Sequence, residues 1–184
     1  NVQTYVFQDI SQNTETYPGG YDGTNAIAIA CSGRDGLQSE HLLVLLDTGA
    51  VHGCGYSNNG QLGTGNNIDN KPTLTPMTAA GGYDGTNAVA ISCGHLNSLV
   101  LLNTGKLLTC GHYNNGSSGT NRPTGEISNL NVLTPMTVDG GYDGTNAVAI
   151  SKGHYCNLVL LNTGMVVVCG LNNQRQLGIG NDID

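Results

Sequence analysis

The hydrophobic positions of this chain fall in short runs bounded by Gly, Asn, Asp or Pro, and the runs come in the same order three times. Runs of about five residues between turn signals predict β-strands rather than helices. The best-matched runs are Leu43–Leu46, Leu99–Leu102 and Leu158–Leu161. The pattern therefore predicts an all-β chain built from a repeated group of strands.

The repeat is clearest in the octapeptide Gly-Gly-Tyr-Asp-Gly-Thr-Asn-Ala, which begins at Gly19, Gly81 and Gly140. Each copy contains four strand-like runs, and four short strands per repeat are typical of a β-propeller blade. We therefore expect three four-stranded antiparallel blades, as a partial propeller or as part of a larger ring or assembly. The predicted divisions are a strand in residues 1–18, then repeats over 19–80, 81–139 and 140–184.

The turn residues and the chain ends refine this prediction. Asp/Asn-Thr-Gly between the second and third runs predicts a hairpin. Pro76 and Pro135 each remove a ladder donor, which places the fourth run at the outer edge of its sheet. Residues 1–18 lie where a fourth strand is expected, and the third repeat stops where its own should begin. The two ends are thus complementary, and two copies in one ring, a longer parent chain and a head-to-tail filament all remain open.

Composition argues against two classes of partner. Charged residues are 10% of the chain and the formal net charge is −7, a balance that argues against binding to nucleic acid or to an anionic membrane surface, because both need a basic face. No run reaches the roughly 20 apolar residues of a membrane-spanning helix. The low charge and the many Asn, Thr and Gly residues favour an extracellular or virion surface, whereas free thiols favour the cytosol, and the compartment stays open.

One insertion marks a candidate binding rim. The first repeat carries extra residues between its first two strands, and insertions in repeat proteins belong to exposed loops that bind partners. The candidate binding residues there are Arg34, Asp35, Leu37, Gln38 and Glu40.

The cysteines and histidines are expected to be structural. Cys54, Cys110 and Cys169 end the third strands, one strand away from Cys31 and Cys93, which is too far for a disulfide. They are predicted to be free thiols, with Cys156 the most exposed. His95 and His154 occupy the same place in two repeats, which favours a structural role. No cofactor, metal site or catalytic residue is predicted.

A family resemblance rests on Ser92-Cys93-Gly94-His95, the following Ser98–Leu101, Gly105 and Cys110-Gly111. With the loop of residues 58–65, this pattern resembles the regulator of chromosome condensation repeat family, in three copies. The resemblance implies a β-propeller, seven-bladed in that family, with Cys at 54, 110 and 169 where the family usually has Trp.

The resemblance does not fix the function, because its members include a nucleotide exchange factor, parts of ubiquitin ligases and a secreted inhibitor of β-lactamases. We expect a non-catalytic module for protein–protein interaction or structural assembly. Its partners would be other proteins or further copies of the chain, bound through loops and open strand edges. The alternative is a regulator that acts through one rim, as a small-GTPase exchange factor or an enzyme inhibitor.

Overall fold

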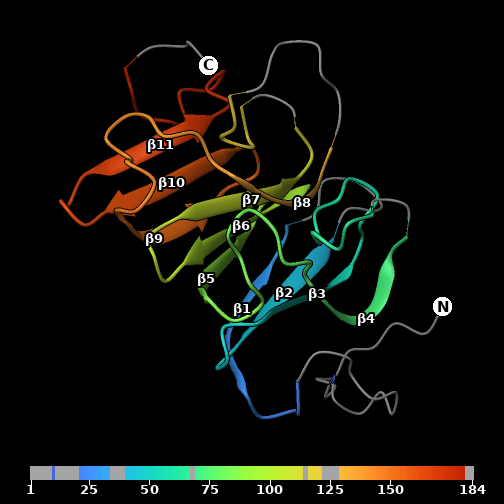
Figure 1. Cartoon of the computed structure of the whole chain (residues 1–184). Helices are drawn as coiled ribbons and strands as arrows, with labels where there is room; N and C mark the ends of the chain where they lie inside the picture. Colours follow the sequence, from blue (N-terminus) through green and yellow to red (C-terminus); the bar gives the residue numbers. More distant parts are fainter. Residues whose placement is uncertain are drawn as a thin grey trace.

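The computed structural model describes residues 10, 21–33, 40–66, 69–113, 116–121 and 129–180. The elements of these residues are eleven β-strands in three antiparallel sheets that stand side by side (Figure 1). We call the sheets blade 1, blade 2 and blade 3, in chain order. The predicted all-β fold of propeller blades is confirmed.

Each blade follows the strand order of the chain. Blade 1 contains β1 (Ala26–Cys31), β2 (His41–Leu46), β3 (Val51–Gly55) and β4 (Lys71–Pro76). Blade 2 contains β5 (Ala88–Cys93), β6 (Asn97–Leu102), β7 (Leu107–Gly111) and β8 (Leu130–Pro135). Blade 3 contains β9 (Ala147–Lys152), β10 (Cys156–Leu161) and β11 (Val166–Gly170). The predicted strand in residues 1–18 lies, apart from Ile10, outside the described residues, as do residues 181–184.

The turn chemistry works as the sequence predicts. The second and third strands of each blade pair as hairpins, and the Gly that ends each hairpin turn has a positive φ, for example 81° at Gly49. The proline-containing strands β4 and β8 lie at the edges of their sheets, where a missing N–H costs no ladder bond.

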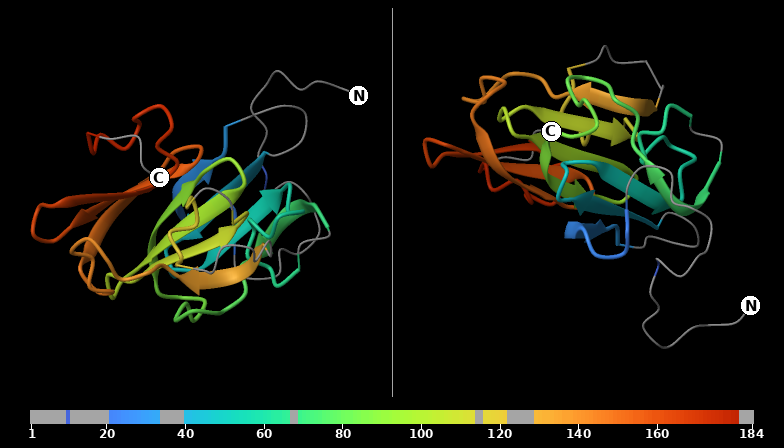
Figure 2. Two further views of the ribbon diagram at one scale, coloured as in Figure 1. Left: turned by 90° about the horizontal axis from the view of Figure 1, so that it is seen from above. Right: turned by 60° about the horizontal axis from the view of Figure 1, so that its bottom comes forward.

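The first strands lie together along one side of the molecule, and β5 contacts both β1 and β9 (Figures 1 and 2). Each first strand has a register shift at the same place, at Ile27, Val89 and Val148. These three side chains are 50–62% exposed, because the shift turns them away from the packed faces.

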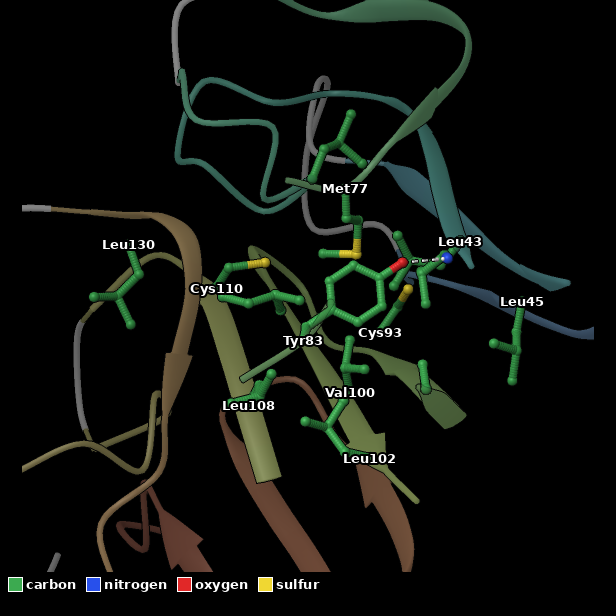
Figure 3. Packing of buried hydrophobic residues seen from close by; sticks show 14 residues of the cluster. Leu43, Leu45, Met77, Tyr83, Cys93, Val100, Leu102, Leu108, Cys110 and Leu130 are labelled. Carbon is green, nitrogen blue, oxygen red and sulfur yellow. Dashed lines mark hydrogen bonds between the residues drawn. The ribbon is translucent and has the colours of Figure 1, made fainter. Parts of the chain in front are cut away.

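The core lies between the blades rather than within one sheet. Leu43 and Leu45 of blade 1 pack against Val100 and Leu102 of blade 2 in one buried cluster, part of which Figure 3 shows around Tyr83. The same relationship recurs one blade later, where Leu99 and Leu101 pack with Val159 and Leu161. Two faces of one strand therefore serve two junctions, which is why the second run of each repeat is apolar at consecutive positions.

A tyrosine of the repeated octapeptide fastens each junction. The Tyr83 hydroxyl, 32 residues after Val51, accepts a hydrogen bond from the Val51 N–H at 2.8 Å, and Tyr142 does the same for Leu107 at 2.8 Å. Both donors belong to the third strand of the preceding blade and are buried. The octapeptide of one repeat thus completes the blade before it.

Candidate interaction surfaces

One face of blade 3 is exposed, although the equivalent faces of blades 1 and 2 are buried. Leu43, Leu99 and Leu158 are equivalent, and their side chains are 0%, 0% and 41% exposed. Leu160 is 38% exposed, whereas its equivalents Leu45 and Leu101 are buried. Val166 is 58% exposed, whereas its equivalents Val51 and Leu107 are buried. We call Leu158, Leu160 and Val166 the trailing face. It is exposed because no following blade covers it among the described residues.

Blade 1 carries the corresponding exposed position at the other end. Ile29 is 82% exposed, whereas its equivalents Ile91 and Ile150 pack against the core clusters of the blades before them. We call this position the leading face. The two end faces are complementary. Between the blades, the residues equivalent to Ile29 pack in the same clusters as the residues equivalent to the trailing face.

The predicted rim is described only at Glu40, because Arg34, Asp35, Leu37 and Gln38 lie outside the described residues. Glu40 is exposed, and its backbone carbonyl accepts a hydrogen bond from the Tyr56 N–H at 2.9 Å. The side chain of Glu40 therefore faces solvent at the base of the inserted loop, and the binding role of the rim stays a prediction.

A polar junction lies between blades 2 and 3, and sequence reasoning missed it. The buried Lys152 ammonium donates hydrogen bonds to the Ser117 carbonyl at 2.9 Å and to the Asn157 side-chain oxygen. Asn157 in turn donates to the same Ser117 carbonyl at 3.0 Å and to the Cys169 sulfur at 3.2 Å. The sequence does contain a sign of this junction, because Lys152 occupies the position that Cys31 and Cys93 have in the first two repeats.

The equivalent junction between blades 1 and 2 has no lysine. There the Ser98 hydroxyl donates to the Gln61 carbonyl at 2.7 Å, and the Cys110 thiol points at the same oxygen. The two junctions therefore satisfy equivalent loop carbonyls, that of Gln61 by a neutral donor and that of Ser117 by a cation.

Burial sets the acid–base behaviour of these groups. It lowers the pKa of Lys152 to about 8, against a partial opposing effect of nearby Cys169. It raises the pKa of Cys93 and of Cys110 to about 12, and raises those of Cys54 and Cys169. These four thiols are therefore protonated and weakly nucleophilic near neutral pH.

The structure corrects one expectation about the cysteines. All six are free thiols, with Cys110 fully buried and Cys54 and Cys169 half-buried. Cys31 is the exposed one, whereas Cys156, which was expected to be the most exposed, is half-buried. Cys31 is exposed because it ends the first strand of blade 1, and no blade precedes blade 1 among the described residues.

The histidines at matching positions contact each other. The His95 and His154 rings stack with centroids 4.2 Å apart, and Tyr155 meets the His154 ring edge-on at 4.1 Å. The side chains thus link equivalent turns of blades 2 and 3 by packing, and their structural role stays a prediction.

The Asp-Gly-Thr-Asn turns of the octapeptide are self-contained. Asp84 accepts hydrogen bonds from the backbone N–H and the hydroxyl of Thr86, at 2.8 and 2.9 Å, and these bonds lower the pKa of the carboxyl group. Asp143 and Thr145 repeat the arrangement. Each carboxylate is occupied in shaping its own turn.

Within the described residues, no three His, Cys, Asp or Glu side chains are grouped so as to hold a metal ion. The same residues include no helix that is long and apolar enough to cross a membrane.

A cavity of about 880 Å³ opens between blades 2 and 3. Its volume lies in the range of about 300–1,000 Å³ that is usual for ligand pockets. Blade 2 contributes the segment around Gly116 and Met136, and blade 3 contributes strand β11 and Leu177. The walls are mostly apolar, so the cavity suits an apolar occupant.

Comparison with known proteins agrees with this geometry. Residues 48–101 match the family model for the regulator of chromosome condensation (RCC1) repeat. The chain carries regulator of chromosome condensation repeats. The match begins in the turn between β2 and β3, includes β3 and β4 of blade 1, and continues through β5 into β6 of blade 2.

Two curated relatives share this repeat region. The X-linked retinitis pigmentosa GTPase regulator homolog of Caenorhabditis elegans is 31% identical over 163 residues, which are 89% of this chain and 10% of that protein. A bifunctional serine/threonine-protein kinase/NEDD4-like E3 ubiquitin-protein ligase of Dictyostelium discoideum is 39% identical over 92 residues, 50% of this chain and 5% of that protein. The repeat chain thus spans a tenth or less of either relative.

Solved structures share the fold of the repeat chain. Yeast RCC1 (Prp20), in a crystal structure with Kap60, superposes with a TM-score of 0.68 at 18% identity, covering 87% of this chain and 35% of that one. Human WBSCR16 gives a TM-score of 0.68 at 21% identity, covering 89% and 38%. At these identities the likeness establishes the fold alone.

Proposed function

We propose that this repeat chain is a non-catalytic β-propeller module that binds protein partners and assembles through its open blade faces. The observation that carries the proposal is the exposure of Leu158, compared with the complete burial of its equivalents Leu43 and Leu99. An apolar face that is covered twice in the same chain is expected to be covered a third time, because leaving it in water forgoes the hydrophobic stabilisation that the other junctions gain.

The similar solved structures support a protein-binding role. The yeast protein was crystallised with Kap60, and another structure of it is described together with its binding to Gsp1p and histones. These partners are proteins, which supports a protein-binding role for this chain. The carboxylates of the octapeptide turns and the thiols of the junctions are already engaged in structure, which supports a non-catalytic role.

Light scattering on the chain across a wide range of concentration tests the proposal. We expect a mass that rises above the 19.0 kDa of one chain as concentration increases. The double variant Leu158→Asn/Leu160→Asn should remain at one-chain mass. The control Val148→Asn changes a residue that is 52% exposed but lies outside the trailing face, and it should associate like the wild type. A wild-type chain that stays monomeric throughout, or a double variant that associates equally, would overturn the proposal.

A second candidate function is regulation through one rim, which the inserted loop of the first repeat favours. Deletion of residues 33–38 separates the two functions. In the regulator, this deletion abolishes nucleotide release from a small GTPase or inhibition of a target enzyme, while self-association is unchanged. In the assembly module, only the trailing-face variant has an effect.

A further inference from the structure

The Asp-Gly dipeptides of the chain are positions where the main chain can rearrange through its own side chain. The glycine nitrogen can attack the carboxyl carbon of the aspartate before it, because glycine has no side chain to block the approach. The chain has five of these dipeptides, which begin at Asp22, Asp35, Asp84, Asp139 and Asp143. Asp35 lies outside the described residues, and the other four can be compared within one fold.

In the link between β8 and β9, the glycine nitrogen lies against the carboxylate that it would attack. The Gly140 N–H donates a hydrogen bond to Oδ1 of Asp139, the residue directly before it, with 2.7 Å between nitrogen and oxygen. The carboxyl carbon Cγ is bonded to this oxygen, so the two atoms that would join are close in the folded chain. Asp139 is exposed, so its carboxyl group is in contact with solvent. Holding the reacting atoms together in this way lowers the barrier to reaction.

The three octapeptide turns hold their carboxylates differently. Oδ1 of Asp84 accepts hydrogen bonds from the N–H and the hydroxyl of Thr86, two residues further on, at 2.8 and 2.9 Å. Asp22 and Asp143 have the same arrangement. These bonds lower the pKa of the three carboxyl groups. Less of the acid form is then present at neutral pH, and it is the acid form that can lose its oxygen as water.

The Asn-Gly dipeptide at Asn59 is also held away from reaction. The Gly60 N–H donates a hydrogen bond to the Ser57 carbonyl at 2.9 Å, so this nitrogen is not directed at the side chain of Asn59. Among the described dipeptides, the contact between a glycine N–H and the carboxylate before it is therefore particular to Asp139 and Gly140.

We propose that Asp139-Gly140 is a site of spontaneous isoaspartate formation. The Gly140 nitrogen forms a bond to Cγ of Asp139, and the proton of that nitrogen leaves with the carboxyl OH as one water molecule. The product is a five-membered succinimide ring. Water then adds to the ring carbonyl that came from the Asp139 main chain and breaks its bond to the Gly140 nitrogen. The main chain then runs through Cβ and Cγ of the residue, with no net change in mass and no oxidant or cofactor.

This modification would act on the junction between blades 2 and 3. The Asp139 carbonyl accepts a hydrogen bond from the Tyr142 N–H at 2.9 Å, and the Tyr142 hydroxyl accepts one from the buried Leu107 N–H at 2.8 Å. An isoaspartate adds a methylene to the main chain just before this tyrosine and turns the former carbonyl into a free carboxylate. The stability of the junction should therefore fall as the protein ages. The inference is independent of the proposed self-association.

Peptide mapping of the aged chain tests the site. The folded chain is incubated at neutral pH for several weeks and digested, and isoaspartate is measured at each Asp-Gly by electron-transfer mass spectrometry, which distinguishes the two isomers. We expect isoaspartate at Asp139 to exceed that at Asp22 and at Asp84 by about tenfold or more. Asp139→Glu should abolish the product at this position, because its longer side chain would have to close a larger ring, and should leave Asp22 and Asp84 unchanged.

The same incubation in guanidinium chloride separates geometry from sequence. The unfolded chain has none of the folded contacts, so Asp139, Asp22 and Asp84 should form isoaspartate at similar rates. Isoaspartate that is absent from Asp139 in the folded chain, or equal at the three positions, would overturn the inference. So would an excess at Asp139 that persists in the unfolded chain, because the local sequence rather than the contact with Gly140 would then cause it.

Discussion

The Tyr83 hydroxyl accepts a hydrogen bond at 2.8 Å from the backbone N–H of Val51, in the preceding blade. Because Val51 is fully buried, this N–H has no access to water when the hydroxyl is removed. The contact therefore couples the folding of two repeats through one donor and one acceptor.

Tyr83→Phe is expected to lower the free energy of unfolding by about 1–3 kcal/mol, the cost of leaving a buried donor without an acceptor. Urea unfolding followed by circular dichroism measures it. The control Tyr56→Phe removes the hydroxyl of a half-buried tyrosine and should change stability by less than about 0.5 kcal/mol. Equal effects of the two variants would show that the junction does not depend on this bond.

The hairpin glycines provide a matched set for the contact between blades. A Cβ on Gly49 or Gly105 would lie 1.9 or 1.8 Å from a backbone oxygen of the next blade, whereas one on Gly164 meets nothing within 4 Å. The φ values are 81°, 78° and 84°, so all three alanine variants share a backbone strain of about 1–2 kcal/mol.

We expect Gly49→Ala and Gly105→Ala to lose at least about 1–3 kcal/mol more than Gly164→Ala, because the backbone of the next blade must move. Thermal or urea unfolding of the three variants gives the comparison. Identical losses would mean that the blades do not pack at this contact.

The pH dependence of stability reports on Lys152. Burial lowers the pKa of Lys152 from 10.5 to about 8, so between these values the unfolded chain holds a proton that the folded chain has released. Stability due to this group therefore rises with pH across that window. The raised pKa values of Cys93 and Cys110 act in the opposite direction above pH 9, where the unfolded chain loses protons that the folded chain keeps.

The stability of wild type relative to Lys152→Met should therefore increase by about 1 kcal/mol from pH 7 to pH 9. Urea unfolding at several pH values measures this difference. Lys106→Met, on the hairpin of blade 2, retains Lys152 and should keep the wild-type profile. A difference that is constant or falls with pH would contradict the burial of a charged Lys152.

The repeat made most of the fold predictable. Gly49, Pro76 and their equivalents fixed the hairpins and the edge strands, because turn geometry and lost ladder donors act locally. The octapeptide tyrosines did not reveal the atoms they bond, since Val51 and Leu107 lie more than thirty residues upstream in another blade.

The interaction surfaces were harder to predict, for a physical reason. Leu43, Leu99 and Leu158 sit in near-identical sequences, and only the presence of a following blade distinguishes their exposure. The substitution of Lys152 for cysteine was visible in the sequence, but its partner is a backbone carbonyl of another repeat. The candidate rim residues could be chosen from the sequence because an insertion in one repeat is visible without knowledge of the neighbouring blades.

The central claim is that each blade covers the apolar face of the one before it and leaves the last face open for a partner. Hydroxyl-radical footprinting at low and high protein concentration measures the oxidation rates of Leu43, Leu99 and Leu158 in one sample. The account predicts fast oxidation of Leu158 alone at low concentration, and its protection as concentration rises. Equal oxidation of the three leucines, or a Leu158 rate that does not change with concentration, would contradict it.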